Sequence, residues 1–388
     1  MSTFWKTGVI AGLVLGLCFP AIADPRPKGA ITPVEVDENG LPVVKVRLSS
    51  KKPGVPDREF RFIFDTGFTL NVIDASVPAD FFWEEPDKPK GVTSTGRDGT
   101  GTVIATPTVC LKRLELAGMT RDDVMAYRLD LKGTMFGRIQ DEPVDGVLGM
   151  NFLRGTRFVL DPDAHAIRWW QDIPGHRIPL SIDGTDRPTL VVRVASTDVP
   201  CMLDTGGNGG IQMPGNADAS EHSEPFGYSS ASGESKEGKT VVMERLESGG
   251  KAWVNVPLDL INPGDGDRMI GLDVLGAAPL GLDLIDLWAT FTLDAKGNLP
   301  YRKTPLRPLL GWDRTPEGNR LLVLGINPVS RWAKAGVKEG DEVLSIGTLT
   351  GKALTLRSAM AFSNGGEAHT WRIRRDGVEQ ILNVPKSE

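Results

Sequence analysis

The stretch FIFDTGFT at residues 62–69 places an apolar run, an aspartate and a glycine turn in direct succession. A second stretch, CMLDTGGN at residues 201–208, repeats this order. The apolar residues of each copy are typical of a buried strand, and the glycine allows a tight turn that leaves the aspartate at the strand end. One such turn would say little, because Asp, Thr and Gly are common in turns for structural reasons. Two copies in one chain suggest an internal duplication.

The repeat continues downstream of each aspartate. VDGVLGMNFL at 144–153 and RMIGLDVL at 268–275 each contain an apolar pair, a glycine and a short helix-like segment. The triplets VLD at 159–161 and GLD at 281–283 then follow their glycines at the same spacing. Because several landmarks keep their order and phase, we predict two diverged copies of one structural unit.

This ordered set of motifs resembles aspartic proteases, and among them the retropepsin-like group rather than the pepsins. The resemblance implies a mainly β fold with two retropepsin-like (acid protease) lobes related by pseudo-two-fold symmetry, the first at 41–175 and the second at 176–300. Two positions depart from the family pattern. The residue after Asp-Thr-Gly, usually Ser, Thr or Ala, is Phe68 in one copy and Gly207 in the other.

The resemblance assigns one catalytic aspartate to each lobe. It implies the following site: catalytic Asp65 and Asp204, Thr66 and Thr205 bracing the two turns, and Gly67 and Gly206 shaping them. Two carboxyls held close together share one proton, because both cannot ionise cheaply. The ionised partner then takes a proton from water while the protonated partner donates to the scissile carbonyl. Protein or peptide substrates are the expected partners.

The activity expected from these residues is that of an exported aspartic endopeptidase. The alternative is a catalytically inactive peptide-binding or adaptor protein with the same fold, which the departures at Phe68 and Gly207 favour. A serine protease is excluded. The glycine-rich stretch that follows Asp204 holds no serine, and no His-Asp-Ser order can be assembled.

The C-terminal part of the chain carries a different pattern. AKAGVKEGDEVLSI at 333–346 resembles a PDZ domain of the bacterial, protease-associated kind, over residues 306–388. The resemblance implies a groove lined by a helix at 356–362. There an extended peptide or a protein C-terminus would add as a strand, with its carboxylate on the backbone amides of Leu310, Gly311 and Trp312. The alternative is a small packing domain that only stabilises the lobes.

Between the aspartate and the second motif, each lobe is expected to carry a β-hairpin flap over the cleft. The candidate tips are STGRDGTG at 94–101 and the stretch 229–239. The alternative is a pair of mobile surface loops without a role, and the position of both stretches within a duplicated protease-like lobe favours flaps.

Composition fits an ordinary globular protein. The chain has 388 residues, of which 40% are hydrophobic and 24% are charged, and its net charge of −6 argues against nucleic acid as a partner. Four scattered histidines show no metal-ligand spacing, so we expect no metal and no cofactor. Cys110 and Cys201 are expected to be buried free thiols, and the chain is expected to be a monomer with an internal pseudo-dimer.

Residues 1–23 have the pattern of a secretory signal: Lys6, an apolar stretch, and AIA at 21–23 before a cleavage point. This predicts export to the periplasm or secretion. An uncleaved anchor is disfavoured because a bilayer span needs about 20 apolar residues. A lipoprotein is disfavoured because Leu17 precedes Cys18. Residues 24–40 are expected to be an N-terminal linker or an entry strand.

Overall fold

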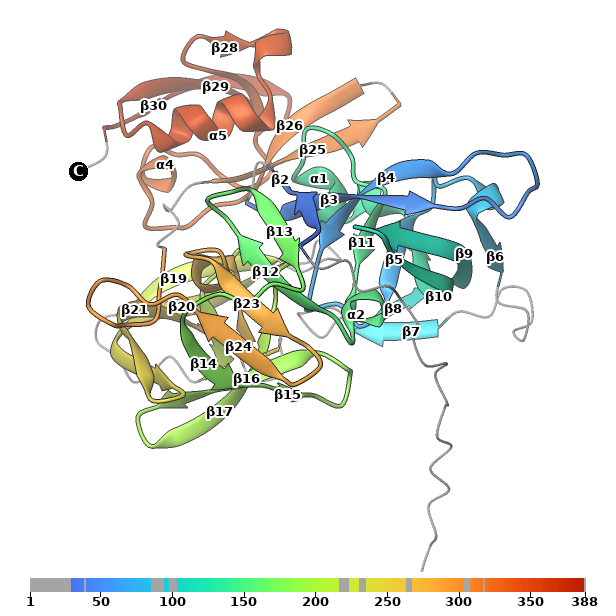
Figure 1. Ribbon diagram of the computed structural model, residues 1–388. Helices are drawn as coiled ribbons and strands as arrows, with labels where there is room; N and C mark the ends of the chain where they lie inside the picture. The colour runs from blue at the N-terminus through green and yellow to red at the C-terminus, as the bar shows by residue number, and fades with distance from the viewer. Residues whose placement is uncertain are drawn as a thin grey trace, which may run out of the picture.

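The structure is a computed structural model that describes residues 29–37, 40–84, 94–97, 103–215, 223–229, 235–262, 267–302, 308–316 and 318–386. These residues form mainly strands, which confirms the mainly β prediction. Figure 1 shows three bodies: the C-terminal unit at the top, one β body at the lower left and one at the right. None of the helices in the described ranges is long and apolar enough to cross a membrane.

The N-terminal sheet has eight strands. In spatial order they are β2 (Glu35–Val36), β3 (Pro42–Leu48), β4 (Arg58–Phe64), β11 (Gly146–Leu148), β5 (Asn71–Asp74), β10 (Met119–Leu129), β9 (Thr108–Leu116) and β6 (Phe82–Glu84). An additional pairing between β3 and β9 curls the sheet towards a barrel. In β3, Val44 and Val46 are buried while Lys45 and Arg47 are exposed, as expected for a strand with one face on the core.

The middle sheet also has eight strands, and it repeats the pairing order of the N-terminal sheet. Its order is β15 (Ser181–Ile182), β16 (Pro188–Val194), β17 (Thr197–Leu203), β22 (Met269–Ile270), β18 (Ile211–Pro214), β21 (Lys251–Ile261), β20 (Ser235–Ser248) and β19 (Ser223–Ser229). The pairing of β16 with β20 corresponds to that of β3 with β9. The two strands that end at the aspartate turns, β4 and β17, occupy the same place in their sheets.

A third, six-stranded sheet joins the two halves. Its order is β1 (Ile31–Pro33), β13 (Ala166–Trp169), β12 (Arg157–Asp161), β23 (Leu280–Asp283), β24 (Trp288–Phe291) and β14 (His176–Pro179). At its centre β12 pairs with β23, so Phe158 lies opposite Leu282. Residues 24–40 were expected to be a linker or an entry strand. Their described part contains β1 and β2, which pair with β13 and β3, so it is strand rather than linker.

Short helical segments follow the strands near the aspartate turns. They are η1 (Ala79–Phe81), η2 (Leu131–Gly133), α1 (Met135–Arg138), α2 (Met150–Leu153) and α3 (Leu272–Leu275). The predicted flaps correspond to two hairpins. One pairs β7 (Ser94–Arg97) with β8 (Val103–Thr106), and the other pairs β19 with β20. Their tips, at 98–102 and 230–234, lie outside the described residues.

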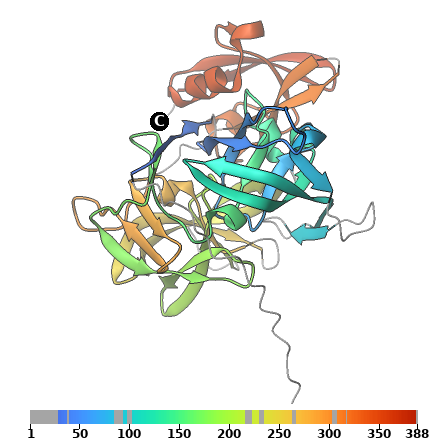
Figure 2. The same ribbon diagram turned by 45° about the vertical axis from the view of Figure 1, so that its right-hand side comes forward.

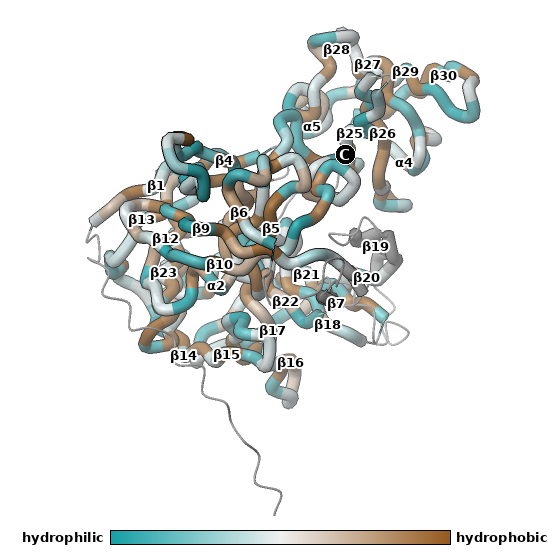
Figure 3. The backbone as a smooth tube through the Cα atoms, turned by 90° about the vertical axis from the view of Figure 1, so that its right-hand side faces the viewer, coloured by the Kyte–Doolittle hydropathy of each residue, from teal (hydrophilic) through white to brown (hydrophobic). Residues whose placement is uncertain are grey.

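The C-terminal unit has a sheet and a hydrophobic core of its own. Its elements are β25 (Leu309–Thr315), β26 (Gly318–Gly325), α4 (Arg331–Lys334), β27 (Glu342–Ile346), β28 (Leu349–Thr350), η4 (Gly351–Ala353), α5 (Leu356–Asn364), β29 (His369–Arg375) and β30 (Val378–Val384). Figures 2 and 3 show this unit against the N-terminal half, at the opposite end of the molecule from β14, β15 and β16.

Candidate active site

The two Asp-Thr-Gly turns are held at the ends of equivalent strands. β4 runs parallel to β11, and the amide of Asp65 donates to the carbonyl of Leu148 at 3.0 Å. In the middle sheet β17 runs parallel to β22, and the amide of Asp204 donates to the carbonyl of Ile270 at 2.9 Å. The apolar pair of the second motif therefore forms the strand that aligns each aspartate.

The glycine after each apolar pair is required by close backbone contact. A Cβ at Gly149 would lie 2.7 Å from the carbonyl oxygen of Phe68, closer than real Cβ atoms approach. The amide of Met150, the first residue of α2, donates to this same carbonyl at 2.7 Å. Gly271 and Leu272 make the equivalent contacts with the carbonyl of Gly207. Each short helix thus fixes its aspartate turn through backbone hydrogen bonds.

Thr66 and Thr205 connect the two turns reciprocally. The amide of Thr66 donates to Thr205 Oγ1 at 3.0 Å, and the amide of Thr205 donates to Thr66 Oγ1 at 3.2 Å. Each hydroxyl also donates across the interface, from Thr66 to Leu203 O at 2.7 Å and from Thr205 to Phe64 O at 2.8 Å. Both threonines are fully buried. Four hydrogen bonds therefore fix the relative position of the two aspartate turns.

The structure brings the carboxyls of Asp65 and Asp204 together. Each lies against the glycine of the opposite turn, so that a Cβ at Gly67 would be 2.6 Å from Asp204 Oδ1 and one at Gly206 would overlap the Asp65 carboxyl. Asp65 is only 3% exposed, and Asp204 is half-buried. Glycine is therefore needed in both turns for the aspartates to meet.

Burial of the pair shifts its protonation. Desolvation, followed by the charge of Asp204, raises the pKa of Asp65 well above its ordinary value of 3.8. Desolvation also raises the pKa of Asp204, although its hydrogen bond to Asp65 and nearby donors oppose the change. One proton is thus retained by the pair above the pH at which an isolated carboxyl would lose it.

Backbone amides supply donors where Phe68 and Gly207 lack a side-chain hydroxyl. The amide of Gly67 donates to Asp65 Oδ1 at 2.7 Å, and the Phe68 amide also lowers the pKa of Asp65. Gly206 and Gly207 do the same for Asp204. The missing hydroxyls are therefore replaced in part, and the unusual residues do not prevent a carboxyl pair from forming.

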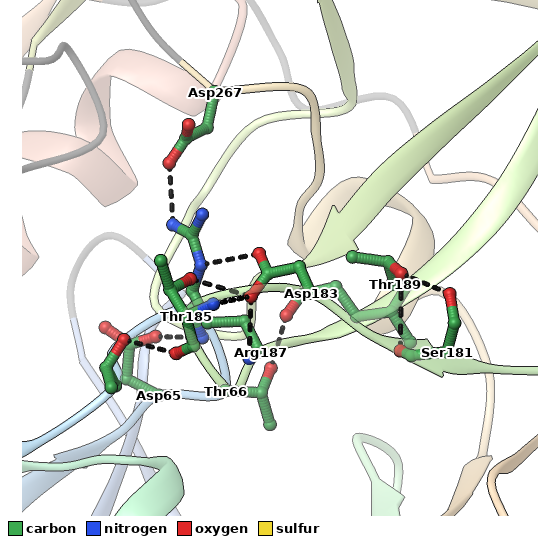
Figure 4. Close-up of polar contacts among 11 residues, drawn as sticks. Asp65, Thr66, Ser181, Asp183, Thr185, Arg187, Thr189 and Asp267 are labelled. Atoms are coloured by element: carbon green, nitrogen blue, oxygen red, sulfur yellow. Dashed lines mark hydrogen bonds and ion pairs between the residues drawn. The ribbon is translucent and has the colours of Figure 1, made fainter. Parts of the chain in front are cut away.

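Arg187 lies near the pair and was not singled out from the sequence. Its guanidinium donates to Asp183 Oδ2 at 3.0 Å and to Asp267 Oδ2 at 2.6 Å, as Figure 4 shows. Its positive charge lowers the pKa of Asp204. Thr69, beside the first turn, donates to the carbonyl of Thr185 in the same loop at 2.7 Å. An arginine in a loop before a strand gives no sequence signal of this role.

The residues predicted to bind the carboxylate of a peptide ligand lie in the C-terminal unit, outside the aspartate turns. Leu310, Gly311 and Trp312 are part of β25, and the side chain of Leu310 is buried in the core of the unit. Trp312 donates its indole N–H to Asp141 of the N-terminal half at 3.0 Å. Cys110 and Cys201 are both free, and the described ranges contain no cluster of His, Cys, Asp or Glu that could hold a metal.

Comparison with known families agrees with this geometry. A sequence model of a family described as aspartyl protease matches residues 53–152. The match runs from before β4, through the Asp65 turn, to α2. No curated protein matches the sequence. Residues 53–152 are therefore similar to the aspartyl protease family, and the mainly β structure with its barrel-like sheets fits an acid-protease fold.

Proposed function

We propose that the protein is an aspartic endopeptidase that hydrolyses peptide bonds with Asp65 and Asp204. The observation that carries the proposal is that the buried Asp65 and the half-buried Asp204 each lie against the glycine of the opposite turn, at the junction of two equivalent sheets. The ionised carboxyl acts as general base on a water molecule, and the protonated one acts as general acid on the scissile carbonyl. No covalent intermediate is formed.

The two halves are proposed to act as acid-protease lobes related by a pseudo-two-fold axis. The equal pairing order of the two eight-stranded sheets and the reciprocal threonine bonds support this. The hairpins β7–β8 and β19–β20 occupy the positions of flaps in the sequence order. Residues 1–23 are proposed to direct export to the periplasm or the exterior; they lie outside the described residues.

The C-terminal unit is proposed to be a PDZ domain. Its strand order and the position of α5 beside β25 support this assignment. In the described part of the chain, β25 has β26 as its strand partner, and an added peptide strand would have to share its other side with α1, whose Arg138 donates to the carbonyl of Trp312. A substrate or partner bound at this edge would be recognised in addition to the contacts it makes in the cleft between the two lobes.

Cleavage of an unfolded, fluorescently labelled protein by the purified chain tests the function. Asp65→Asn and Asp204→Asn should each abolish hydrolysis, because the acid and base roles belong to one shared-proton pair. Asp74→Asn is the matched control, since Asp74 is equally buried at 3% exposed but its carboxylate accepts from Ser76 and Leu131, away from the pair. An inactive wild type, or activity that survives in either site variant, would refute the assignment. An inactive wild type that still binds peptides would indicate the adaptor.

A further inference from the structure

The C-terminal unit is fastened to the loop that contains α1. Arg314 of β25 donates to the carbonyls of Gln140 at 2.6 Å and Asp141 at 3.0 Å. In the other direction, Arg138 Nε donates to the carbonyl of Trp312 at 3.4 Å. A Cβ at Gly311 would lie 3.0 Å from the carbonyl oxygen of Arg138, so the backbones are in close contact. Figure 1 shows α1 directly beneath β25.

Asp141 is the polar centre of this contact. Its carboxylate accepts the indole N–H of Trp312 at 3.0 Å and the amides of Leu356 at 2.7 Å and Arg357 at 3.1 Å. These amides begin α5, where the helix dipole and unpaired N–H groups favour an anion. A carboxylate from the N-terminal half thus caps a helix of the C-terminal unit and joins it to β25.

A hydrophobic cluster continues from this contact towards the Asp65 turn. Leu324 of β26 is 7% exposed and packs with Met135, Phe136 and Ile139 in one cluster. Phe68, the residue after the first Asp-Thr-Gly, packs against the same cluster. Its ring is 6.4 Å from that of Phe136, in an edge-to-face arrangement. Phe68, which departs from the family pattern, is therefore in contact with the α1 segment, and the C-terminal unit holds that segment.

We propose that Phe68 is a positioning residue that couples the Asp65 turn to the docked C-terminal unit through Phe136 and the α1 segment. The proposal rests on the proposed function. It gives the C-terminal unit a second role besides peptide recognition, which is to hold the Asp65 turn in place. With Phe68 held at its side chain and its carbonyl held by Met150, the turn is fixed from two directions. Loss of the Asp141 contact would release α1 and one of these restraints.

Kinetics with a short peptide substrate provide the first test. Phe68→Ala should lower kcat about 10- to 100-fold with little change in KM, because small displacements of a reacting group cost this much. Phe68→Leu, which keeps an apolar contact, should recover most of the loss. Asp141→Ala should lower kcat in the wild type but have no further effect in Phe68→Ala, since both act through one chain of contacts. Additive effects would overturn the proposal.

Amide hydrogen exchange of the peptide 62–70 provides a second test that does not need cleavage. Asp141→Ala should increase exchange in this peptide, and Trp312→Phe, which removes the indole N–H bond but leaves the two amide bonds to Asp141, should increase it less. Asp294→Ala is the matched control, because Asp294 also accepts two backbone amides, from Lys296 and Asn298 at 2.8 Å each, in a turn after β24. Unchanged exchange at 62–70 in Asp141→Ala would overturn the proposal.

The two tests also separate this inference from the proposed function. If the wild type cleaves no substrate but Asp141→Ala still loosens residues 62–70, the protease assignment fails and the positioning contact stands. If the wild type cleaves and Asp141→Ala changes neither kcat nor exchange, the protease assignment stands and the positioning role is refuted.

Discussion

Replacing Thr66 by valine removes one hydroxyl from the junction between the two aspartate turns. The substitution keeps the shape of the side chain but leaves two buried groups without a partner. These are the carbonyl of Leu203, which accepts from Thr66 Oγ1, and the amide of Thr205, which donates to it. Leaving a buried polar group unpaired costs about 1–3 kcal/mol. We therefore expect a loss of about 2–6 kcal/mol in the free energy of unfolding.

Denaturant unfolding of Thr66→Val, Thr66→Ser and a matched control measures this loss. Thr156→Val is the control, because Thr156 is also fully buried but its hydroxyl donates only to the nearby carbonyl of Leu153, at 2.6 Å. Thr66→Ser should retain most of the stability. The double variant Thr66→Val/Thr205→Val should lose less than the sum of the single variants, because the bonds are reciprocal.

Activity gives a second reading of the same change. The hydroxyls of Thr66 and Thr205 fix the relative position of the two carboxyls. Thr66→Val should therefore lower kcat and leave KM nearly unchanged. If Thr66→Val costs no more stability than Thr156→Val and leaves kcat unchanged, the junction does not depend on these hydrogen bonds, and our reasoning is wrong.

Three further outcomes follow from the titratable groups. Because the pKa of Asp65 is raised above 3.8, the folded state holds the proton longer than the unfolded state, so stability should fall as pH rises from 3.8 through the folded pKa. Unfolding free energies of the wild type should show this slope, and Asp65→Asn should show a smaller one, since Asp204 keeps a raised pKa of its own. Arg187 favours the ionised form of Asp204, so Arg187→Gln should raise the pair's pKa and move the basic limb of the pH–rate profile upward. Arg187→Lys should restore it, and an unshifted limb in Arg187→Gln would contradict the role. Burial raises the pKa of the Cys201 thiol to about 12, so Cys201 should resist thiol reagents near pH 8 until the protein unfolds. Rapid labelling of Cys201 in the native protein would show that its environment is open.

The duplicated motifs carried the most information in the sequence. The Asp-Thr-Gly turns and the apolar-apolar-Gly segments are local patterns, so both the mainly β class and the similarity to aspartyl proteases could be predicted, and both are confirmed. The glycines were predicted from turn geometry alone. The structure adds a second reason at Gly67 and Gly206, which face the opposite carboxyl.

Contacts between distant segments could not be predicted in this way. Asp141 lies 215 residues from Leu356, and no local pattern marks it as the cap of α5. Phe68 could be recognised as unusual but not explained, because its partner Phe136 lies in a short helix without periodicity. Whether residues 31–36 form a linker or an entry strand could not be decided from the sequence, because such short strands depend on partners far along the chain. The PDZ assignment, the export signal and the catalytic roles remain predictions.

The six-stranded joining sheet has a consequence for how the protein behaves on dilution. Its central pair, β12 with β23, brings together strands from the two halves within one chain, and β13 and β24 flank this pair. The halves therefore meet at an effective concentration set by their covalent connection rather than by the amount of protein in solution. A site built from two separate chains would lose activity per molecule when diluted below its dissociation constant. Here specific activity should stay constant down to the lowest concentration that can be assayed.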